Sequence, residues 1–162
     1  MNMDIEARKL NRYLQVACIR QDFISAKLLI ERGADVNPSE EDTPPILIPT
    51  YLRKLYPDFL KLLIKNGAYL SVVNDQGNIP LHLAPRWGNA NAVKILSLSG
   101  ASVEELNNQN ETPLWATVNH INKRAGRKCA PIMLTSDAVK ILISHGSNIC
   151  EKFGESSLMD SL

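Results

Sequence analysis

The chain has 162 residues, of which 44% are hydrophobic and 22% charged, and its formal net charge is +1. These values are ordinary for one globular domain with a continuous core, and the small net charge excludes an overall field that would draw nucleic acid or membrane. We expect no membrane association, because no apolar run reaches the roughly 18 residues of a membrane span and the first residues lack the basic and apolar regions of a signal peptide.

Four glycines mark a repeated phrase along the chain. Gly33, Gly67, Gly100 and Gly146 each follow an apolar run, and the intervals between them are 34, 33 and 46 residues. Glycine adopts the left-handed backbone conformation at little cost and therefore commonly ends a helix. A period of about 33 residues predicts a stacked array of helical repeats. We interpret the longer third interval as a repeat with an insertion.

The first predicted repeat spans about 10–37 and the second about 38–70. The first lacks a Thr-Pro opening, and Glu6, Arg8, Lys9 and Arg12 precede or begin it. This pattern fits an N-terminal capping repeat, whose outer face has to be polar. The second repeat opens at Thr43, where threonine can cap a helix and proline can occupy its first position.

The third predicted repeat spans about 74–103 and the fourth about 107–149, with an insertion at about 119–136 that separates its two helices. The partial repeat at 151–162 stops before a second helix. It is either a cap on the fourth repeat or the start of a longer array.

These phrases resemble the ankyrin family. The match is Thr-Pro-Leu-His-x-Ala, seen as Ile79-Pro80-Leu81-His82-Leu83-Ala84, followed by Leu-Leu-x-x-Gly-Ala-Asp-x-Asn. The resemblance implies an all-α solenoid of helix-turn-helix units with projecting hairpin loops, forming a single domain over residues 1–162. It also implies that His82 makes hydrogen bonds joining neighbouring repeats. The implied function is non-catalytic binding of another protein through the hairpin tips and the concave inner-helix surface.

Two prolines and the insertion depart from the repeat pattern. Pro49 and Pro85 fall late in the inner helices of repeats two and three, which should therefore end early or kink. This would either simply shorten the helices or re-aim the concave surface. The insertion contains four cations within six residues. It is a solvated loop, a contact for an acidic partner, or a signal for nuclear import or nucleic-acid contact, although it lacks aromatic residues for base stacking.

The predicted partner-binding residues lie at hairpin tips, at inner-helix ends and in the basic insertion. Trp87 is either a binding anchor, because tryptophan and arginine are enriched in hot spots, or a packing residue between repeats. The predicted set is Arg20, Tyr51, Asp75, Gln76, Asn78, Arg86, Trp87, Asn108, Gln109, Glu111, Asn119, His120, Lys123, Arg124, Arg127, Lys128, Lys152 and Phe153.

Motifs for catalysis or metal binding are absent from the sequence. Cys18, Cys129 and Cys150 are scattered and indicate reduced thiols in a cytosol-like compartment. We expect no enzyme activity, no cofactor, no small-molecule substrate and no nucleic-acid partner, and a cytoplasmic monomer, with the nucleus as a second location. The alternative function is a targeting or adaptor segment of a larger protein, such as a host-directed effector in the host cytosol or a ubiquitin-ligase substrate adaptor.

Overall fold

The computed structural model describes residues 2–38, 43–50, 57–125 and 136–147. Every regular element in these ranges is a helix, as the all-α prediction requires. The helices are α1 (Asn2–Arg20), α2 (Phe23–Glu31), α3 (Leu47–Thr50), α4 (Pro57–Lys65), α5 (Pro80–Arg86), α6 (Ala90–Leu98), α7 (Pro113–Ala125) and α8 (Asp137–Ser144).

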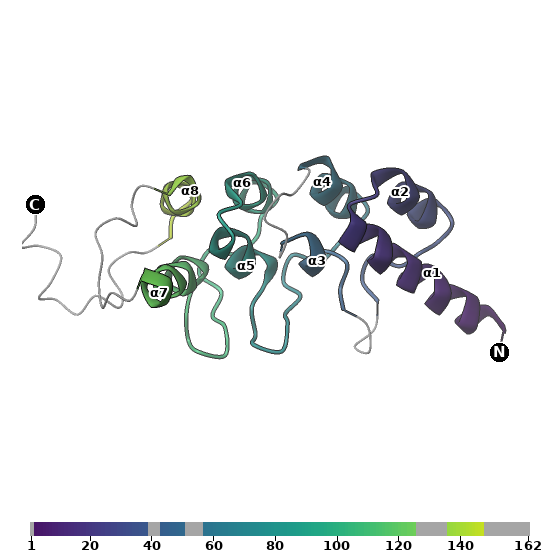
Figure 1. Ribbon diagram of the computed structural model, residues 1–162, viewed down its shortest axis with the longest axis horizontal. Coiled ribbons are helices and arrows are strands. Elements are labelled where there is room, and N and C mark those ends of the chain that lie inside the picture. The colour runs from purple at the N-terminus through teal and green to yellow at the C-terminus, as the bar shows by residue number, and fades with distance from the viewer. Residues whose placement is uncertain (1, 39–42, 51–56, 126–135, 148–162) are drawn as a thin grey trace, which may run out of the picture.

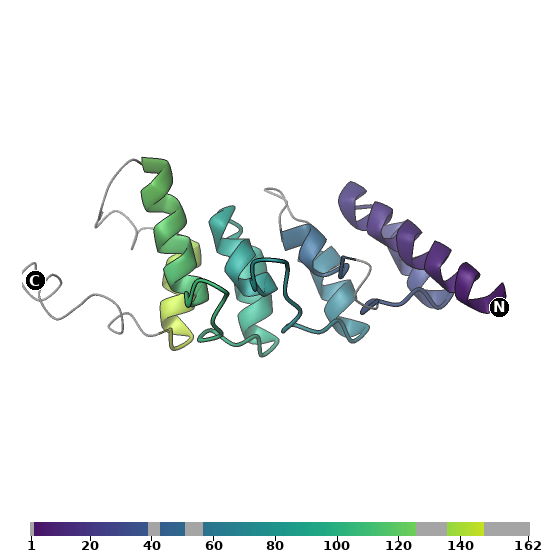
Figure 2. The same ribbon diagram turned by 90° about the horizontal axis from the view of Figure 1, so that it is seen from below.

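The helices form two rows along one axis. Inner helices α1, α3, α5 and α7 make the lower row in Figure 1, and outer helices α2, α4, α6 and α8 make the upper row. Each inner helix packs against the next inner helix, and each outer helix against the next outer helix. The connections that precede α5 and α7 project to the same side, away from the outer row (Figure 1). Figure 2 shows the same array turned by 90°.

Glycine ends the outer helices as the repeated phrase predicts. Gly33, Gly67, Gly100 and Gly146 all have positive φ angles, between 85° and 95°. In the first repeat the amide of Ala34 also bonds to the carbonyl of Leu29, which satisfies a carbonyl of the last helical turn. The amide of Gly33 bonds to the carbonyl of Ile30, and equivalents of both bonds occur at the other three glycines. The glycine therefore marks the same geometry at the end of each outer helix.

The core runs continuously between the two rows. Leu14, Leu81 and Leu114 of the inner helices and Leu63 and Leu96 of the outer helices are all buried within it. Because each repeat buries its apolar side chains against its neighbours, the core depends on stacking rather than on any single helix pair.

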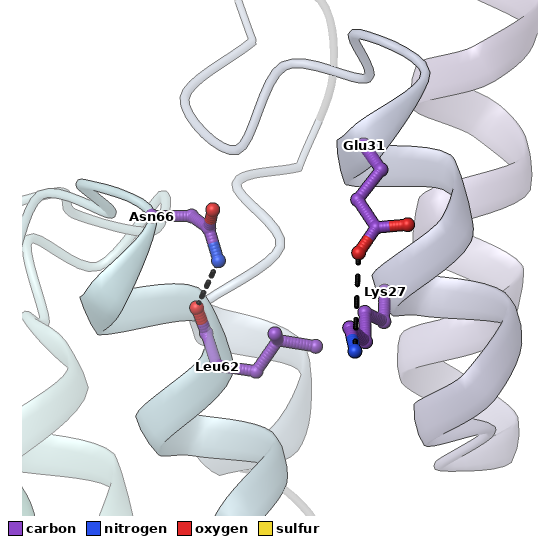
Figure 3. A network of polar contacts seen from close by, with 4 residues as sticks. All are labelled: Lys27, Glu31, Leu62 and Asn66. Atoms are coloured by element: carbon purple, nitrogen blue, oxygen red, sulfur yellow. Dashed lines mark hydrogen bonds and ion pairs between the residues drawn. The ribbon is translucent and has the colours of Figure 1, made fainter.

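The polar side chains at outer helices α2 and α4 shown in Figure 3 bond to their own helices. Figure 3 shows Leu62 of α4 pointing toward Lys27 of α2. Lys27 pairs with Glu31 across one turn, at 3.9 Å, and Asn66 donates a hydrogen bond to the carbonyl of Leu62. The ion pair is exposed and contributes little stability, so apolar burial dominates this contact.

The structure corrects the predicted start of the insertion. Residues 119–136 were expected to separate the two helices of repeat four, yet α7 continues to Ala125, so the first part of this segment is helix. His120 therefore lies within α7 rather than after it. Residues 126–135, like the partial repeat at 151–162, lie outside the described residues.

The first repeat is longer and less polar outside than expected. Helix α1 begins at Asn2, eight residues before the predicted repeat. Glu6, Arg8 and Arg12 are exposed as a capping face requires, but Tyr13 and Val16 are exposed as well. The outer face of this repeat therefore combines charged and apolar side chains.

Candidate functional site

One repeat position falls at the end of α1 and directly after α5, but within α7. The phrases that open the inner helices begin at Arg12, Thr43, Ile79 and Thr112, and this position is the ninth residue of each. It is occupied by Arg20, Tyr51, Trp87 and His120. Tyr51 lies outside the described residues. We call the other three the inner-helix ladder, because they occupy one repeat position on α1, α5 and α7, which stand in the same row of the array (Figure 1). The ladder combines an exposed cation with two ring-bearing side chains.

Trp87 and His120 form the contact between two rungs of the ladder. Trp87 follows α5 as its C-cap and is 41% exposed. Its ring lies 6.3 Å from the ring of His120, centroid to centroid, with an interplanar angle of 52°. This tilted geometry is favourable for two aromatic rings. Trp87 therefore keeps an exposed face while its other contacts hold it against α7.

Arg86 closes the same junction from α5. Its Nη2 atom lies 3.4 Å from Nδ1 of His120. A guanidinium can only donate, so Nδ1 accepts and carries no proton in this arrangement. Arg86, Trp87 and His120 thus form a cluster across the α5–α7 junction, and we call it the edge cluster.

Asn119 and Lys123 extend the edge cluster along α7. Asn119 donates from Nδ2 to Oε1 of Glu111 at 2.6 Å, which ties α7 to the hairpin before it. Lys123 is exposed one turn further on. Arg124 lies in α7, but its side chain is outside the described residues. The continuation of α7 therefore places Lys123 beyond the point where α5 has ended.

The hairpin tips of repeats three and four are built around two asparagines at the same repeat position. The Oδ1 atom of Asn74 accepts from the amides of Gln76 and Asn78, and that of Asn107 accepts from the amides of Gln109 and Glu111. Such local bonds are the reason that asparagine favours turns.

The two tips also bond directly to each other. The amide of Asn108 donates to the carbonyl of Gln76 at 3.1 Å, and its side chain donates to the carbonyl of Asp75 at 3.2 Å. Gly77 has a φ of 72°, and a Cβ there would collide with Asn108. Docking of the tips thus depends on Gly77. Reasoning from the sequence missed this role, although Gly77 in a turn was a visible signal.

Asn78 does not fit the predicted contact surface. It is only 1% exposed, and its Oδ1 accepts from Nδ2 of Asn107 at 2.9 Å. Its side chain serves the joint between hairpins and is not accessible to a partner. Asp75, Gln76, Asn108 and Gln109 are exposed, and Glu111 is half-buried.

His82 has the structural role that the resemblance implies. Its Nδ1 accepts from the amide of Ile79, and its Nε2 donates to the carbonyl of Glu111 at 2.8 Å, which joins repeat three to repeat four. Burial lowers the pKa of His82, against a raising contribution from the Glu111 carbonyl. The ring is therefore neutral and committed to holding α5 to the next hairpin.

Part of the predicted set cannot be placed. Tyr51, Arg127, Lys128, Lys152 and Phe153 lie outside the described residues. Within the described ranges, no group of three or more histidine, cysteine or acidic side chains is arranged to hold a metal ion. No helix in those ranges is both long enough and apolar enough to cross a membrane.

Comparison with known proteins places these observations in a family. A family model described as ankyrin repeats, in three copies, matches residues 50–152. An ankyrin repeat protein of fowlpox virus (strain NVSL) is 31% identical over 115 residues, covering 67% of this chain and 32% of that protein. An ankyrin repeat-containing protein of Caenorhabditis elegans is 43% identical over 61 residues. That match covers 38% of this chain and 5% of that protein.

Rabankyrin-5 of Homo sapiens is 26% identical over 124 residues, covering 69% of this chain and 11% of that protein. The matched part is thus at most about a third of the length of these three relatives. Ankyrin repeats are generally protein-interaction modules and typically non-catalytic. With the family match covering more than half of its residues and the helix pairs stacked in register, the chain belongs to the ankyrin-repeat family.

Proposed function

We propose that the chain binds a partner protein through the edge cluster, with the hairpin tips of repeats three and four as a second contact. The observation that carries this proposal is Trp87, a tryptophan that is 41% exposed at a helix end while its ring packs against the ring of His120 in a tilted contact. Tryptophan and arginine side chains in such positions supply much of the energy of protein interfaces. Because the Trp87 side chain is already held in place, less side-chain conformational entropy is lost when a partner binds.

The charges around the edge cluster favour an acidic partner segment. Arg86 and Lys123 lie beside the cluster, and neither takes part in an ion pair among the described side chains. Positive groups beside an exposed aromatic ring attract acidic residues and raise the rate of encounter. We infer a partner segment that combines an apolar or aromatic side chain, placed on Trp87, with nearby acidic side chains.

The hairpin tips would widen this contact. Asp75, Gln76, Asn108 and Gln109 present polar groups on the same side of the array to which the tips project. Because the two tips are bonded to each other, they would offer one rigid surface rather than two separate loops. Such polar contacts contribute more to specificity than to affinity.

The test is affinity capture from the native source with three matched baits. The wild-type chain and Leu98→Ser should retain a common protein that Trp87→Ala loses. Leu98 is a suitable control because it is also an exposed apolar residue but lies on outer helix α6, away from the edge. A protein retained equally by all three baits would contradict the proposed surface.

The alternative role, a targeting or adaptor segment within a longer protein, would use the same edge. This alternative role predicts that the captured protein is degraded or moved to another location after it binds. Following the abundance and location of the captured protein with and without this chain separates that role from simple binding. We place such binding in the cytoplasm, where reduced cysteines such as buried Cys18 persist.

A further inference from the structure

We propose that the end of the array formed by α1 and α2 is a second docking surface, and that it binds an amphipathic helix whose apolar stripe is flanked by acidic residues. We call this surface the N-terminal end face. Its apolar part is Tyr13, Val16 and Leu28, and its basic rim is Lys9, Arg12 and Arg20. It lies at the opposite end of the array from the α5–α7 junction (Figure 2).

The apolar residues occupy positions that the other repeats bury or half-bury. Val16 corresponds to Leu47, Leu83 and Ala116, which are all buried, yet Val16 is 43% exposed. No described inner helix follows α7, and Ala116 is buried all the same. In repeats two to four an inner helix lies before this position along the array, and within the described ranges none lies before α1.

Tyr13 and Leu28 follow the same rule. Tyr13 corresponds to Pro44, which is half-buried, and to Pro80 and Pro113, which are buried, but is itself 61% exposed. Leu28 corresponds to Leu62, which is half-buried and points toward the preceding outer helix in Figure 3. Leu28 is 47% exposed. All three side chains thus occupy positions that lie between repeats in the rest of the array. In the other repeats, a helix of the neighbouring repeat covers such positions.

The positive charges around the apolar residues predict which side chains flank the apolar stripe of the bound helix. Lys9 lies one turn before Tyr13, and Arg12 and Arg20 lie one turn before and after Val16, so the cations border the apolar residues on one helical face. None of them belongs to an ion pair recorded among the described side chains. Glu6 is the one exposed acid described on α1. Acidic residues on both sides of the docked helix would complement this rim.

The same rim argues against a second copy of the chain as the occupant. Docking two N-terminal end faces on each other would place the cations of one copy, Lys9, Arg12 and Arg20, against the same set of cations of the other. Like charges facing each other across an interface cost several kcal/mol. A separate acidic helix avoids this repulsion and uses the same apolar surface.

The experiment uses two synthetic helical peptides of about 20 residues, long enough to present several turns. Both carry leucine with helical spacing, and their flanking positions are glutamate in one and lysine in the other. Titration of the isotope-labelled full chain by nuclear magnetic resonance at about 50 mM salt, where charges are weakly screened, reports both affinity and location. We expect the glutamate peptide to bind at least about tenfold more tightly and to shift resonances of α1 and α2.

Variants locate the contact on the end face. Val16→Glu and, separately, Leu28→Glu should each weaken binding of the glutamate peptide by about tenfold or more, because each adds a buried like charge. Leu98→Glu is the matched control and should bind as the wild type does. It tolerates glutamate because Glu31 occupies the corresponding position of the first repeat. Circular dichroism checks that each variant remains folded.

Three results would overturn the proposal. One is equal binding of the two peptides, or binding of neither. Another is unchanged binding in both Val16→Glu and Leu28→Glu. The third is a wild-type dimer in light scattering that Val16→Glu converts to a monomer, which would assign the end face to a second copy of the chain.

Discussion

Helices α5 and α7 are equivalent elements of neighbouring repeats, yet they differ in how they end. Both begin at the proline of the same phrase, Pro80 and Pro113, but α5 ends after 7 residues and α7 continues for 13. The residue equivalent to Pro85 is Val118, which removes no amide donor. This substitution indicates that local sequence contributes to the different lengths of α5 and α7.

Proline is only part of this difference. After α5, Gly88 takes a positive φ of 72° and Asn89 caps α6. In repeat four, Ile121 stands in place of Gly88. A β-branched residue strongly disfavours a positive φ, so α7 has no turn at this point and continues. Repeat one keeps the turn with Gln21, whose φ is 54°, followed by Asp22, which caps α2.

The difference creates the edge cluster. Because α5 ends, Trp87 sits at a helix terminus with an exposed ring. Because α7 continues, His120 at the same repeat position lies along a helix and supports that ring from the side. One repeat position thus supplies an anchor in repeat three and its support in repeat four.

The largest expected effect comes from making α7 resemble α5. Val118→Pro removes a backbone hydrogen bond within α7 and introduces a clash with the preceding turn, so it should destabilise the protein by about 3 kcal/mol or more and lower helical ellipticity. Urea unfolding followed by circular dichroism measures both changes. Unchanged ellipticity would mean that α7 does not depend on an uninterrupted backbone ladder at this position.

The reciprocal change is the control. Pro85→Ala should not lengthen α5, because Gly88 and Asn89 still end it, and it should alter stability by no more than about 1 kcal/mol. A clear gain in helical ellipticity would show that Pro85 alone determines the length of α5.

A smaller effect on stability is expected from removing the hydrogen bonds by which His82 joins repeats three and four. His82→Ala leaves the carbonyl of Glu111 and the amide of Ile79 without these partners, and it should lower stability by about 1–3 kcal/mol. Lost partner binding with an unchanged unfolding midpoint would instead assign His82 to recognition.

The pH dependence of stability sharpens the same point. Burial lowers the pKa of His82 below its ordinary value near 6.5, so the unfolded chain binds a proton more readily than the native chain. This contribution to stability is therefore fully present above about pH 6.5 and is lost as the pH falls toward the native pKa. Protonation of Nδ1 would also break the bond from Ile79. His82→Gln should flatten this dependence in urea midpoints measured across the range, whereas an identical slope would contradict it.

The smallest effect on stability is expected from the basic segment that begins on α7. Neutralising Lys123, Arg124, Arg127 and Lys128 together should leave the unfolding midpoint nearly unchanged but slow association with an acidic partner and reduce its salt dependence. Association rates at two ionic strengths measure this. If the rates do not change, the segment is only a spacer.

Several features of the fold could be predicted because their signals are local. The glycine period located the outer-helix ends, and His82 was assigned correctly from one phrase. The length of α7 was missed, although Ile121 in place of a turn glycine was visible, because the longer interval to Gly146 was interpreted as a loop. The exposed end face could not be predicted, since the burial of Val16 depends on which helices surround it.

The candidate site was harder to predict than the fold. Asn78 and Asp75 look alike as polar residues in a turn, yet one is buried in the joint between hairpins and the other is exposed. The structural difference is that Nδ2 of Asn107 bonds to the Asn78 side chain across the joint between the two hairpins. The pairing of Trp87 with His120 likewise follows from the stacking geometry, which no short motif specifies.

The most direct measurement of the central claim is the affinity of Trp87→Ala for the captured partner, determined by calorimetry beside the thermal midpoint of the free protein. We predict that binding weakens by about 2 kcal/mol, roughly 30-fold, while the midpoint stays close to that of the wild type because the side chain is partly exposed. Leu98→Ala should change neither quantity. An unfolded Trp87→Ala variant, or one that is folded and binds with wild-type affinity, would contradict the claim that the edge cluster is the contact surface.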